Sequence, residues 1–282
     1  MLKKYKPYII AFFAMSLCSL AAASFIDLDL DIRLNNPNSA FAIWFEATGE
    51  MPCRLLTTVA GVLLFYLCDK LWQKALGLLI NLGGSVYLGY HIAHYLFRER
   101  YNLAFGIVFG IGFAAVALWV GKYISVPEQL KKTLIILSVA GVAVMFVQLG
   151  IIEIVKIFWG RIRFRDLIKM QSYEAFTQWY HPNGANGHRS FPSGHTAGAA
   201  MSYLMMFFPY ISKKWAYKRY LCFSLPLIYT SIVAYTRLVM GAHYLSDVTV
   251  GGMIGFITVI AAMYVLDKKF FNTGKINNTC NS

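Results

Sequence analysis

The sequence predicts an all-α fold: a polytopic membrane bundle of about eight transmembrane helices, formed by a single domain over residues 1–282. Two observations predict it. Hydrophobic residues make up 58% of the chain and charged residues only 14%, which is too apolar for an ordinary soluble domain. In addition, the apolar residues gather in runs of roughly 17 to 25, the length at which an α-helix crosses a bilayer.

Eight apolar runs are candidates for these helices. They are residues 8–25, 52–68, 75–97, 103–121, 133–159, 192–211, 220–239 and 244–266. A cleaved signal peptide is an alternative interpretation of the first run, because lysines precede its apolar residues 9–20 and three alanines follow them.

The basic residues predict the orientation of the bundle. Most of the 26 lysines and arginines fall at the N-terminus and in every second connection after it, which the positive-inside rule places in the cytoplasm. We therefore expect a multi-pass protein of the cell membrane with both termini in the cytoplasm. Because the net charge of +13 is dispersed between apolar runs, we expect no nucleic-acid partner.

The first outer connection, residues 26–51, has two features of its own. Asp27, Asp29 and Asp31 stand at alternate positions, a spacing that would put three carboxylates on one side of an extended segment. We interpret them as a solvated acidic loop, with a metal site as the alternative. Farther along, residues 39–48 follow a cap-like Asn-Ser pair and carry apolar side chains, which predicts an amphipathic helix at the outer membrane interface.

Two patterns inside the apolar runs indicate helix packing or substrate lining more than a catalytic or metal-binding role. His91 and His94 are three residues apart and so share a helix face, but no third ligand for zinc is evident, which favours a structural or substrate-lining role. Glycines recur in four-residue steps at 106–110, 194–198 and 251–255, a spacing that predicts close contact between membrane helices.

Three polar clusters lie at the ends of apolar runs that the predicted orientation places outside. In the cluster nearest the C-terminus, His243 and Asp247 are four residues apart, so the carboxylate can hold one ring nitrogen while the other stays unprotonated. A histidine held in this way can attack phosphorus. Arg237 ends the preceding run, and Gly241 permits a tight return of the chain. The alternative is an ion-paired group that only orients helices.

The other two clusters are suited to binding an anion. Residues 192–195, Pro-Ser-Gly-His, look like a helix start with Ser193 as its cap, and free backbone N–H groups there can bind phosphate; the alternative is an ordinary cap. Lys156 and Arg163 lie at the end of the fifth run, where arginine can bind phosphoryl oxygens bidentately. Their alternative role is contact with lipid headgroups.

As a set, these clusters resemble the tripartite signature of the type 2 phosphatidic acid phosphatase superfamily, which also includes glucose-6-phosphatases and vanadium haloperoxidases. The resemblance covers residues 156–247, about a third of the chain. Its elements are Lys156 with Arg163 seven residues on, then Pro-Ser-Gly-His, then Arg237, His243 and Asp247. The sequence departs from the usual pattern at Phe164, where the family has proline, and at Thr236, where it has serine.

The resemblance implies a role for each matched residue. His243 would be the nucleophile that forms a phosphohistidine, with Asp247 orienting it, and His195 would protonate the leaving group and then activate water. The phosphoryl oxygens would be bound by Lys156, Arg163, Ser193, Gly194 and Arg237, with no metal ion and no other cofactor. Outside the signature, Arg161, Arg165, His188 and Arg189 are candidates for headgroup or second-phosphate contacts.

The family core has six helices, so an eight-helix bundle implies an added hairpin, expected to comprise the third and fourth runs around Arg98-Glu99-Arg100. The turn-rich loop at 161–191 is expected to act as a lid. The implied function is hydrolysis of a lipid phosphate or diphosphate at the outer face, with undecaprenyl diphosphate, phosphatidic acid, phosphatidylglycerol phosphate or a phosphorylated glycolipid as candidate substrates. Transfer of the phosphate to another lipid and non-enzymatic binding or transport of lipid headgroups are the alternatives. The headgroup and the oligomeric state stay open.

Overall fold

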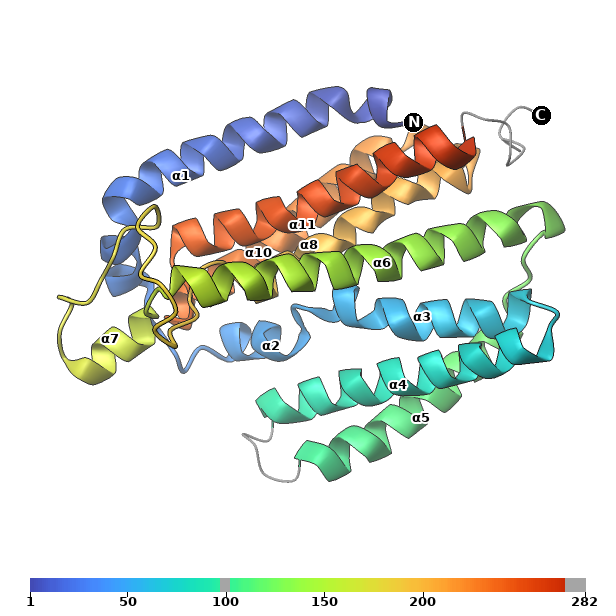
Figure 1. Ribbon diagram of the computed structural model, residues 1–282, viewed down its shortest axis with the longest axis horizontal. Coiled ribbons are helices and arrows are strands. Elements are labelled where there is room, and N and C mark those ends of the chain that lie inside the picture. The colour runs from blue at the N-terminus through green and yellow to red at the C-terminus, as the bar shows by residue number, and fades with distance from the viewer. Residues whose placement is uncertain (97–101, 272–282) are drawn as a thin grey trace.

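The computed structural model describes residues 1–96 and 102–271, and every regular element within them is helical, which confirms the all-α fold. The helices run roughly along one long axis (Figure 1). In chain order they are η1 (Leu2–Tyr5), α1 (Lys6–Leu34), α2 (Ala40–Thr48), α3 (Met51–Leu67), α4 (Leu71–Leu96), α5 (Asn102–Lys122), α6 (Glu128–Trp159), α7 (Phe164–Met170), α8 (Gly194–Ala200), η2 (Met201–Tyr210), α9 (Lys213–Tyr217), α10 (Arg219–Val239), α11 (Leu245–Leu266) and η3 (Asp267–Phe271).

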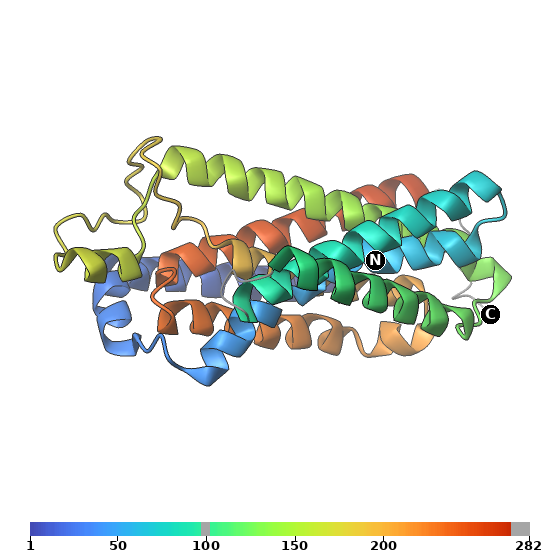
Figure 2. The ribbon, with the colours of Figure 1, turned by 90° about the horizontal axis from the view of Figure 1, so that it is seen from below.

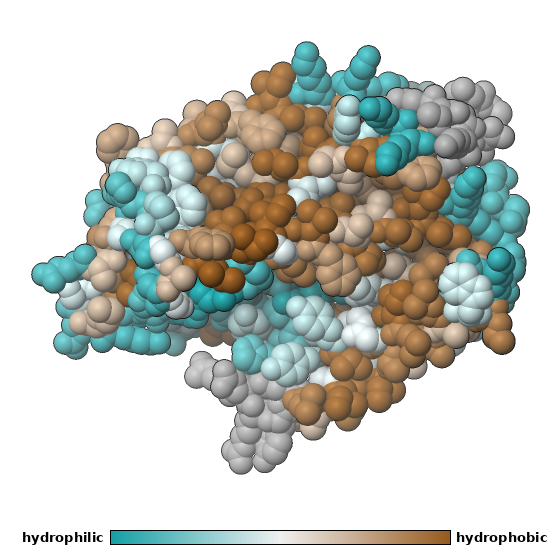
Figure 3. All heavy atoms as spheres, in the orientation of Figure 1, coloured by the Kyte–Doolittle hydropathy of each residue, from teal (hydrophilic) through white to brown (hydrophobic). Residues whose placement is uncertain are grey.

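Seven helical segments within the described residues are long and apolar enough to cross a membrane, so the chain is a multi-pass membrane protein. They contain α1, α2 with α3, α4, α5, α6, α10 and α11. Large apolar side chains point outward along them, among them Phe146, Ile154 and Phe158 on α6. In Figure 3, hydrophobic side chains cover much of the middle of one face, while hydrophilic ones gather at both ends. This pattern suits a bundle surrounded by lipid.

The sixth predicted segment, 192–211, differs from the expectation of one continuous α-helix. Its first part is α8, and from Met201 it continues as the 3-10 helix η2, which contains Pro209. The 3-10 form rises by about 2.0 Å per residue against about 1.5 Å for the α form, so these 17 residues reach roughly 30 Å, the thickness of the bilayer core. The segment therefore extends as far as a longer α-helix would.

The start and end of this segment lie beside the start and end of α11. Near the start, the Ser193 N–H donates to the Asp247 carbonyl at 2.9 Å. At the other end, the Tyr210 hydroxyl donates to Asp267 at 2.7 Å. Asp267 also accepts from the N-terminal amine of Met1 at 3.0 Å, which brings the beginning of the chain to this second end of the bundle.

Helices α4 and α5 pack against each other as the expected hairpin, on the side of the bundle opposite α1 (Figures 1 and 2). Gly106 and Gly110 allow this contact, because a Cβ at these positions would lie within 3 Å of Tyr90 and Val86, respectively. The predicted turn at Arg98-Glu99-Arg100 lies outside the described residues. Helix α3 joins the hairpin to the rest of the bundle through its contacts with α4 and α6.

Glycines also bring α11 against α8, as the four-residue steps predict. A Cβ on Gly255 would lie 2.6 Å from the Cβ of Ala200, and one on Gly251 would lie 2.3 Å from the Ser193 carbonyl oxygen. Below this contact, Phe256 packs against Phe12 and Tyr203 in the aromatic core. The close approach of α8 and α11 fixes the relative position of the two segments that carry His195 and His243.

We predict that Gly255→Leu destabilises the protein by about 1–3 kcal/mol or more, because the added side chain cannot fit between α11 and α8. Gly112→Leu on α5 is the matched control, since a Cβ at that position meets nothing within 4 Å. Thermal unfolding of both variants in the same detergent measures the difference. Equal midpoints for the two variants would contradict the packing described here.

Candidate active site

Helix α6 ends in a turn that only glycine can make. Gly160 has a φ of 55°, and a Cβ there would lie 2.0 Å from the Gly184 carbonyl oxygen. The turn points the chain from Lys156, in the last turn of α6, toward Arg161 and Arg163. Two amides, Asn183 and Asn186, donate to the Gly160 carbonyl at 3.4 and 2.7 Å and hold the following loop on the turn.

The three signature segments meet at this end of the bundle. A Cβ on Gly194 would lie 3.2 Å from Lys156 Nζ, so the first segment contacts the second. The second contacts the third through Ser193 and Asp247, as described above. The Arg165 N–H donates to the Gly241 carbonyl at 2.8 Å, which joins the first to the third. The structure thus assembles one site from the three predicted clusters.

Ser193 caps α8, and its hydroxyl accepts from the Thr196 N–H at 3.4 Å. The cap is fully buried, and the chain passes directly from it to Gly194 and His195. The absence of a side chain at 194 lets the Lys156 ammonium lie close to the start of α8. Both the cap and the glycine therefore have the local structure that the sequence predicts, with the lysine ammonium beside them.

His243 and Asp247 lie close together, with 3.6 Å between Nδ1 and Oδ2, slightly longer than a hydrogen bond. The pKa of His243 is lowered to about 4, chiefly by burial and also by Arg163 and Lys156, while Asp247 acts in the opposite direction. The imidazole is therefore neutral at neutral pH, the state in which a ring nitrogen can act as a nucleophile.

Asp247 is fully buried and held from several sides. Its Oδ2 accepts from the Ser190 hydroxyl and from the Tyr244 N–H at 3.1 Å, and its Oδ1 accepts from Arg161 at 2.6 Å. These bonds fix the carboxylate in place before any substrate binds. They also show that Ser190 and Arg161, which lie outside the signature, support the His243 pair.

Arg161 is not a headgroup contact, which corrects the prediction made for it. Its side chain is 0% exposed, and one guanidinium lies between two buried carboxylates: Asp247 and Asp27, the latter at 2.9 Å. The same guanidinium donates to the Ser246 hydroxyl at 2.8 Å and to the Thr177 carbonyl at 2.9 Å. Four of its five N–H groups have partners within the described residues, and the side chain has no exposed surface to offer a lipid.

The expectation of an extended acidic loop at 26–51 is also wrong in its first part, because α1 continues to Leu34. On a helix, residues four apart share a face, so Asp27 and Asp31 are buried while Asp29 is exposed. Asp27 accepts from the Ser246 N–H at 3.0 Å in addition to Arg161, which commits it to an ion pair. In the later part, the predicted helix and its cap are confirmed, since Ser39 caps α2 by accepting from the Ala42 N–H, while the position of this helix at the outer interface stays a prediction.

Glu46 on α2 and Glu50 at the start of α3 also belong to the site, although neither was among the site residues predicted from the sequence. Glu46 accepts from Arg237 at 3.0 Å, and Glu50 Oε1 lies 3.2 Å from His195 Nδ1. Arg54 forms an ion pair with Glu50. A signal was present, because carboxylates within an apolar stretch usually have a functional partner, and Glu46, Glu50 and Arg54 are spaced at four-residue steps.

The remaining predicted site residues differ in their burial and in the partners that they contact. Arg163 is half-buried, and its Nε has no hydrogen-bond partner within the described residues. Lys156 lies 3.5 Å from Glu153, which also forms an ion pair with Arg189. Arg165 is half-buried and His188 is exposed, so either remains a candidate for contact with substrate.

Phe164, the departure from the family's proline, is 1% exposed and stacks on Tyr173 with 6.1 Å between ring centroids. Its edge meets Tyr244, whose ring also faces the Arg161 guanidinium at 4.1 Å. The aromatic side chain thus packs the beginning of α7 against the support of Asp247. The loop that follows is also anchored, since the Trp179 indole donates to Ser24 on α1 at 3.1 Å.

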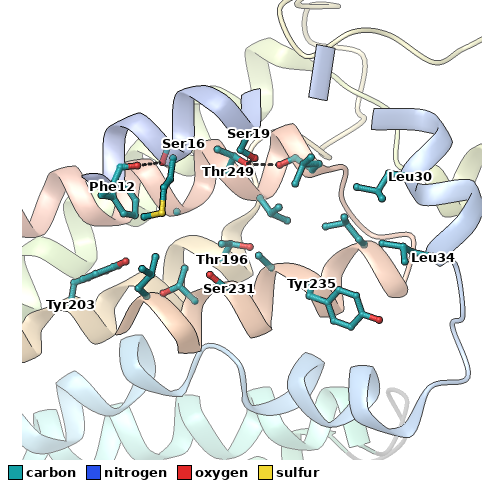
Figure 4. Close-up of a pocket in the computed structure, with 18 residues that line it drawn as sticks. Phe12, Ser16, Ser19, Leu30, Leu34, Thr196, Tyr203, Ser231, Tyr235 and Thr249 are labelled. Carbon is teal, nitrogen blue, oxygen red and sulfur yellow. Dashed lines mark hydrogen bonds between the residues drawn. The ribbon is translucent and has the colours of Figure 1, made fainter. Parts of the chain in front are cut away.

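A separate cavity of about 400 Å³ lies between α1, α10, α11 and η2 (Figure 4). Apolar side chains line most of it, with hydroxyls such as those of Ser231 and of Ser19 and Thr249, which hydrogen-bond each other at 2.8 Å. Thr196, the residue after His195, is part of its wall. None of the predicted catalytic or phosphate-binding side chains lines it, so the cavity and the charged site are distinct.

Comparison with known protein families gives a match to part of the chain. The model of the PAP2 superfamily matches residues 133–271, a stretch that runs from within α6 to the end of η3 and contains all three signature segments. No curated protein and no solved structure matches the chain. Asp27, Glu46 and Glu50 precede the matched stretch.

We predict that Asp27→Asn destabilises the protein by about 3–5 kcal/mol, because it leaves the Arg161 guanidinium buried with one carboxylate in place of two. Asp29→Asn is the matched control: its carboxylate is exposed on the same helix, and its loss is expected to cost less than about 0.5 kcal/mol. Thermal or denaturant unfolding in detergent checks both. Similar stabilities of the two variants would show that the buried ion pair contributes little.

We also predict the pH dependence of attack by His243. Because its pKa is lowered from 6.5 to about 4, the neutral form persists as the pH falls below 6.5 and is lost only as the pH falls through about 4. In Asp247→Asn the carboxylate that raises this pKa is gone, so the loss moves to still lower pH. The profile of kcat/KM, corrected for ionisation of the substrate, is the measurement. A wild-type acid limb near pH 6.5 would contradict the buried neutral state.

Proposed function

Since the chain belongs to the PAP2 superfamily, we propose that it hydrolyses a lipid phosphate or diphosphate, without a metal ion, through a phosphohistidine on His243. Membership of this superfamily indicates that the chain has phosphatase activity on phosphate esters. The observation that carries the finer proposal is the meeting of the three signature segments at one end of the bundle, with a neutral His243 beside a fixed Asp247.

In the first step, the free ring nitrogen of His243 attacks phosphorus, and the bond from phosphorus to the leaving oxygen breaks. His195 gives a proton to that oxygen, so the alcohol or phosphate departs in its protonated form. Asp247 stabilises the positive charge that develops on His243. Its bonds to Arg161 and Ser190 keep it in position, so it needs little rearrangement as the reaction begins.

In the second step, a water molecule attacks the phosphohistidine, and His195 accepts its proton. Inorganic phosphate leaves, and His243 returns to the neutral form. The phosphoryl oxygens would contact Lys156, Arg163 and Arg237, with backbone N–H donors from Gly194 and His195, which follow the Ser193 cap. The cationic side chains neutralise the negative charge of the phosphoryl group and the N–H groups donate hydrogen bonds to it, so the proposed mechanism requires no metal ion.

We place the site at the outer face of the cell membrane, on the basis of the lysines and arginines in alternate connections. Single cysteines at Asn186 and Lys214, in a background without native cysteines, should then react with impermeant reagents from opposite sides. Reaction from one side only would overturn this orientation.

A transferase would use the same first step with a lipid acceptor in place of water, whereas a headgroup carrier would not need the His243 and Asp247 pair.

We predict that the purified protein releases inorganic phosphate from lipid phosphates, keeps that activity in EDTA and loses it in vanadate, which can occupy the phosphoryl position. The measurement is a panel of lipid phosphates and diphosphates with free phosphate as the readout. Phosphate recovered in a second lipid in place of solution would favour the transferase. Loss of activity in EDTA with recovery in magnesium would contradict the metal-free mechanism.

A further inference from the structure

The side chains around His195 come from elements that precede the family-matched residues. Nδ1 of its ring lies 3.2 Å from Glu50 Oε1, and Nε2 lies 3.2 Å from the Glu46 carbonyl oxygen. The rings of Tyr95 and His91 on α4 lie at centroid distances of 5.5 and 6.2 Å. Because a general acid must reach the leaving oxygen, these groups surround the place from which the leaving group departs.

Charge on this side of the site is balanced. Glu50 forms an ion pair with Arg54, and Glu46 forms one with Arg237 at 3.0 Å, so each carboxylate is matched by one arginine. Beyond these pairs, Lys156, Arg163 and Arg165 belong to the segment that would hold the transferred phosphoryl group. On the His195 side, Arg54 and Arg237 therefore each have a carboxylate partner, which reduces the positive charge that they offer to a second phosphate.

The position of Glu50 is built into the packing of the bundle. A Cβ on Gly198 would lie 3.0 Å from Glu50 Cγ, so the absence of a side chain on α8 makes room for the glutamate. The Arg54 guanidinium faces the Tyr87 ring at 4.5 Å, which attaches the ion pair to α4. His195 thus has a fixed carboxylate partner, as His243 does in Asp247. Such a partner fixes the orientation of the imidazole, and proton donation by His195 matters most when the leaving group is a poor one.

His91 adds a neutral hydrogen-bonding group. It is 7% exposed, and its Nε2 has no hydrogen-bond partner within residues 1–96 and 102–271. A buried polar atom without a partner is costly, and an imidazole nitrogen can exchange a hydrogen bond with a hydroxyl group of a ligand. A hydroxylated leaving group beside His195 would satisfy it.

We infer that the leaving group is an uncharged alcohol, so that the site takes lipid phosphomonoesters in preference to lipid diphosphates. The inference rests on the proposed function and narrows its substrate class. The bond from phosphorus to the ester oxygen breaks, His195 supplies the proton, and a neutral alcohol departs. In a diphosphate the departing group is itself a phosphate, and its negative charge would lie beside the Glu50 carboxylate.

The direct test compares dodecyl phosphate with dodecyl diphosphate, using the full-length protein in detergent micelles. Phosphate is the better leaving group, so a site without selectivity would hydrolyse the diphosphate faster. We expect kcat/KM to be at least about tenfold higher for the monophosphate, as like-charge repulsion would produce. An equal or faster rate with the diphosphate would overturn this inference alone. Turnover of neither compound by folded protein would overturn the proposed function as well.

A second measurement removes the repulsive charge and does not depend on turnover by the variant. Vanadate binding, followed by tryptophan fluorescence, is competed with inorganic phosphate or methylenediphosphonate in wild type and in Glu50→Gln. We expect the dissociation constant of the diphosphonate to fall about tenfold in the variant and that of phosphate to change less than about threefold. Glu128→Gln, at the far end of α6, controls for the loss of one negative charge. An unchanged ratio of the two constants in Glu50→Gln would overturn the role given to this carboxylate.

Discussion

The ion pairs of Arg161 with Asp27 and Asp247 are the interaction on which the site depends most. All three side chains are at most 1% exposed, and removing charges from water is costly unless each has close partners. Here the partners come from α1, from the turn after α6 and from α11, so satisfying the charges requires these three elements to meet. The same bonds fix the carboxylate that faces His243. Folding of the bundle and preparation of the proposed nucleophile therefore depend on the same contacts.

The residues that precede the family-matched half of the chain complete the site. Asp27 holds Arg161, Glu46 holds Arg237, and Glu50 holds His195, so each of the three signature segments has a carboxylate partner from α1, α2 or α3. The matched half carries the groups proposed to act on phosphate. The first half sets the charge around them and, through α4, the surroundings of the leaving group. We attribute the choice of substrate chiefly to this first half.

The parts of the fold predicted from sequence are those that the membrane dictates. A bilayer requires long apolar helices, so seven of the eight predicted segments correspond to helices of sufficient length. The segment at 192–211 was predicted as one α-helix but is largely a 3-10 helix. Apolar composition does not distinguish an α-helix from a 3-10 helix that spans the same distance with fewer residues. The clusters were found because their spacing is local. The partners of Arg161, His195 and Arg237 were not, since Asp27, Glu50 and Glu46 are each more than 100 residues away in the chain, and local spacing does not encode such pairings.

The central claim is that these contacts prepare His243 to take the phosphoryl group covalently. Rapid acid-free quenching of the protein with a ³²P-labelled lipid phosphate, followed by peptide mapping, measures it most directly. The account predicts a labelled phosphohistidine at position 243 that is stable in alkali and labile in acid, that forms in wild type and accumulates in His195→Ala, and that is absent in His243→Ala. Label at another residue, or label that persists in a folded His243→Ala protein, would contradict it.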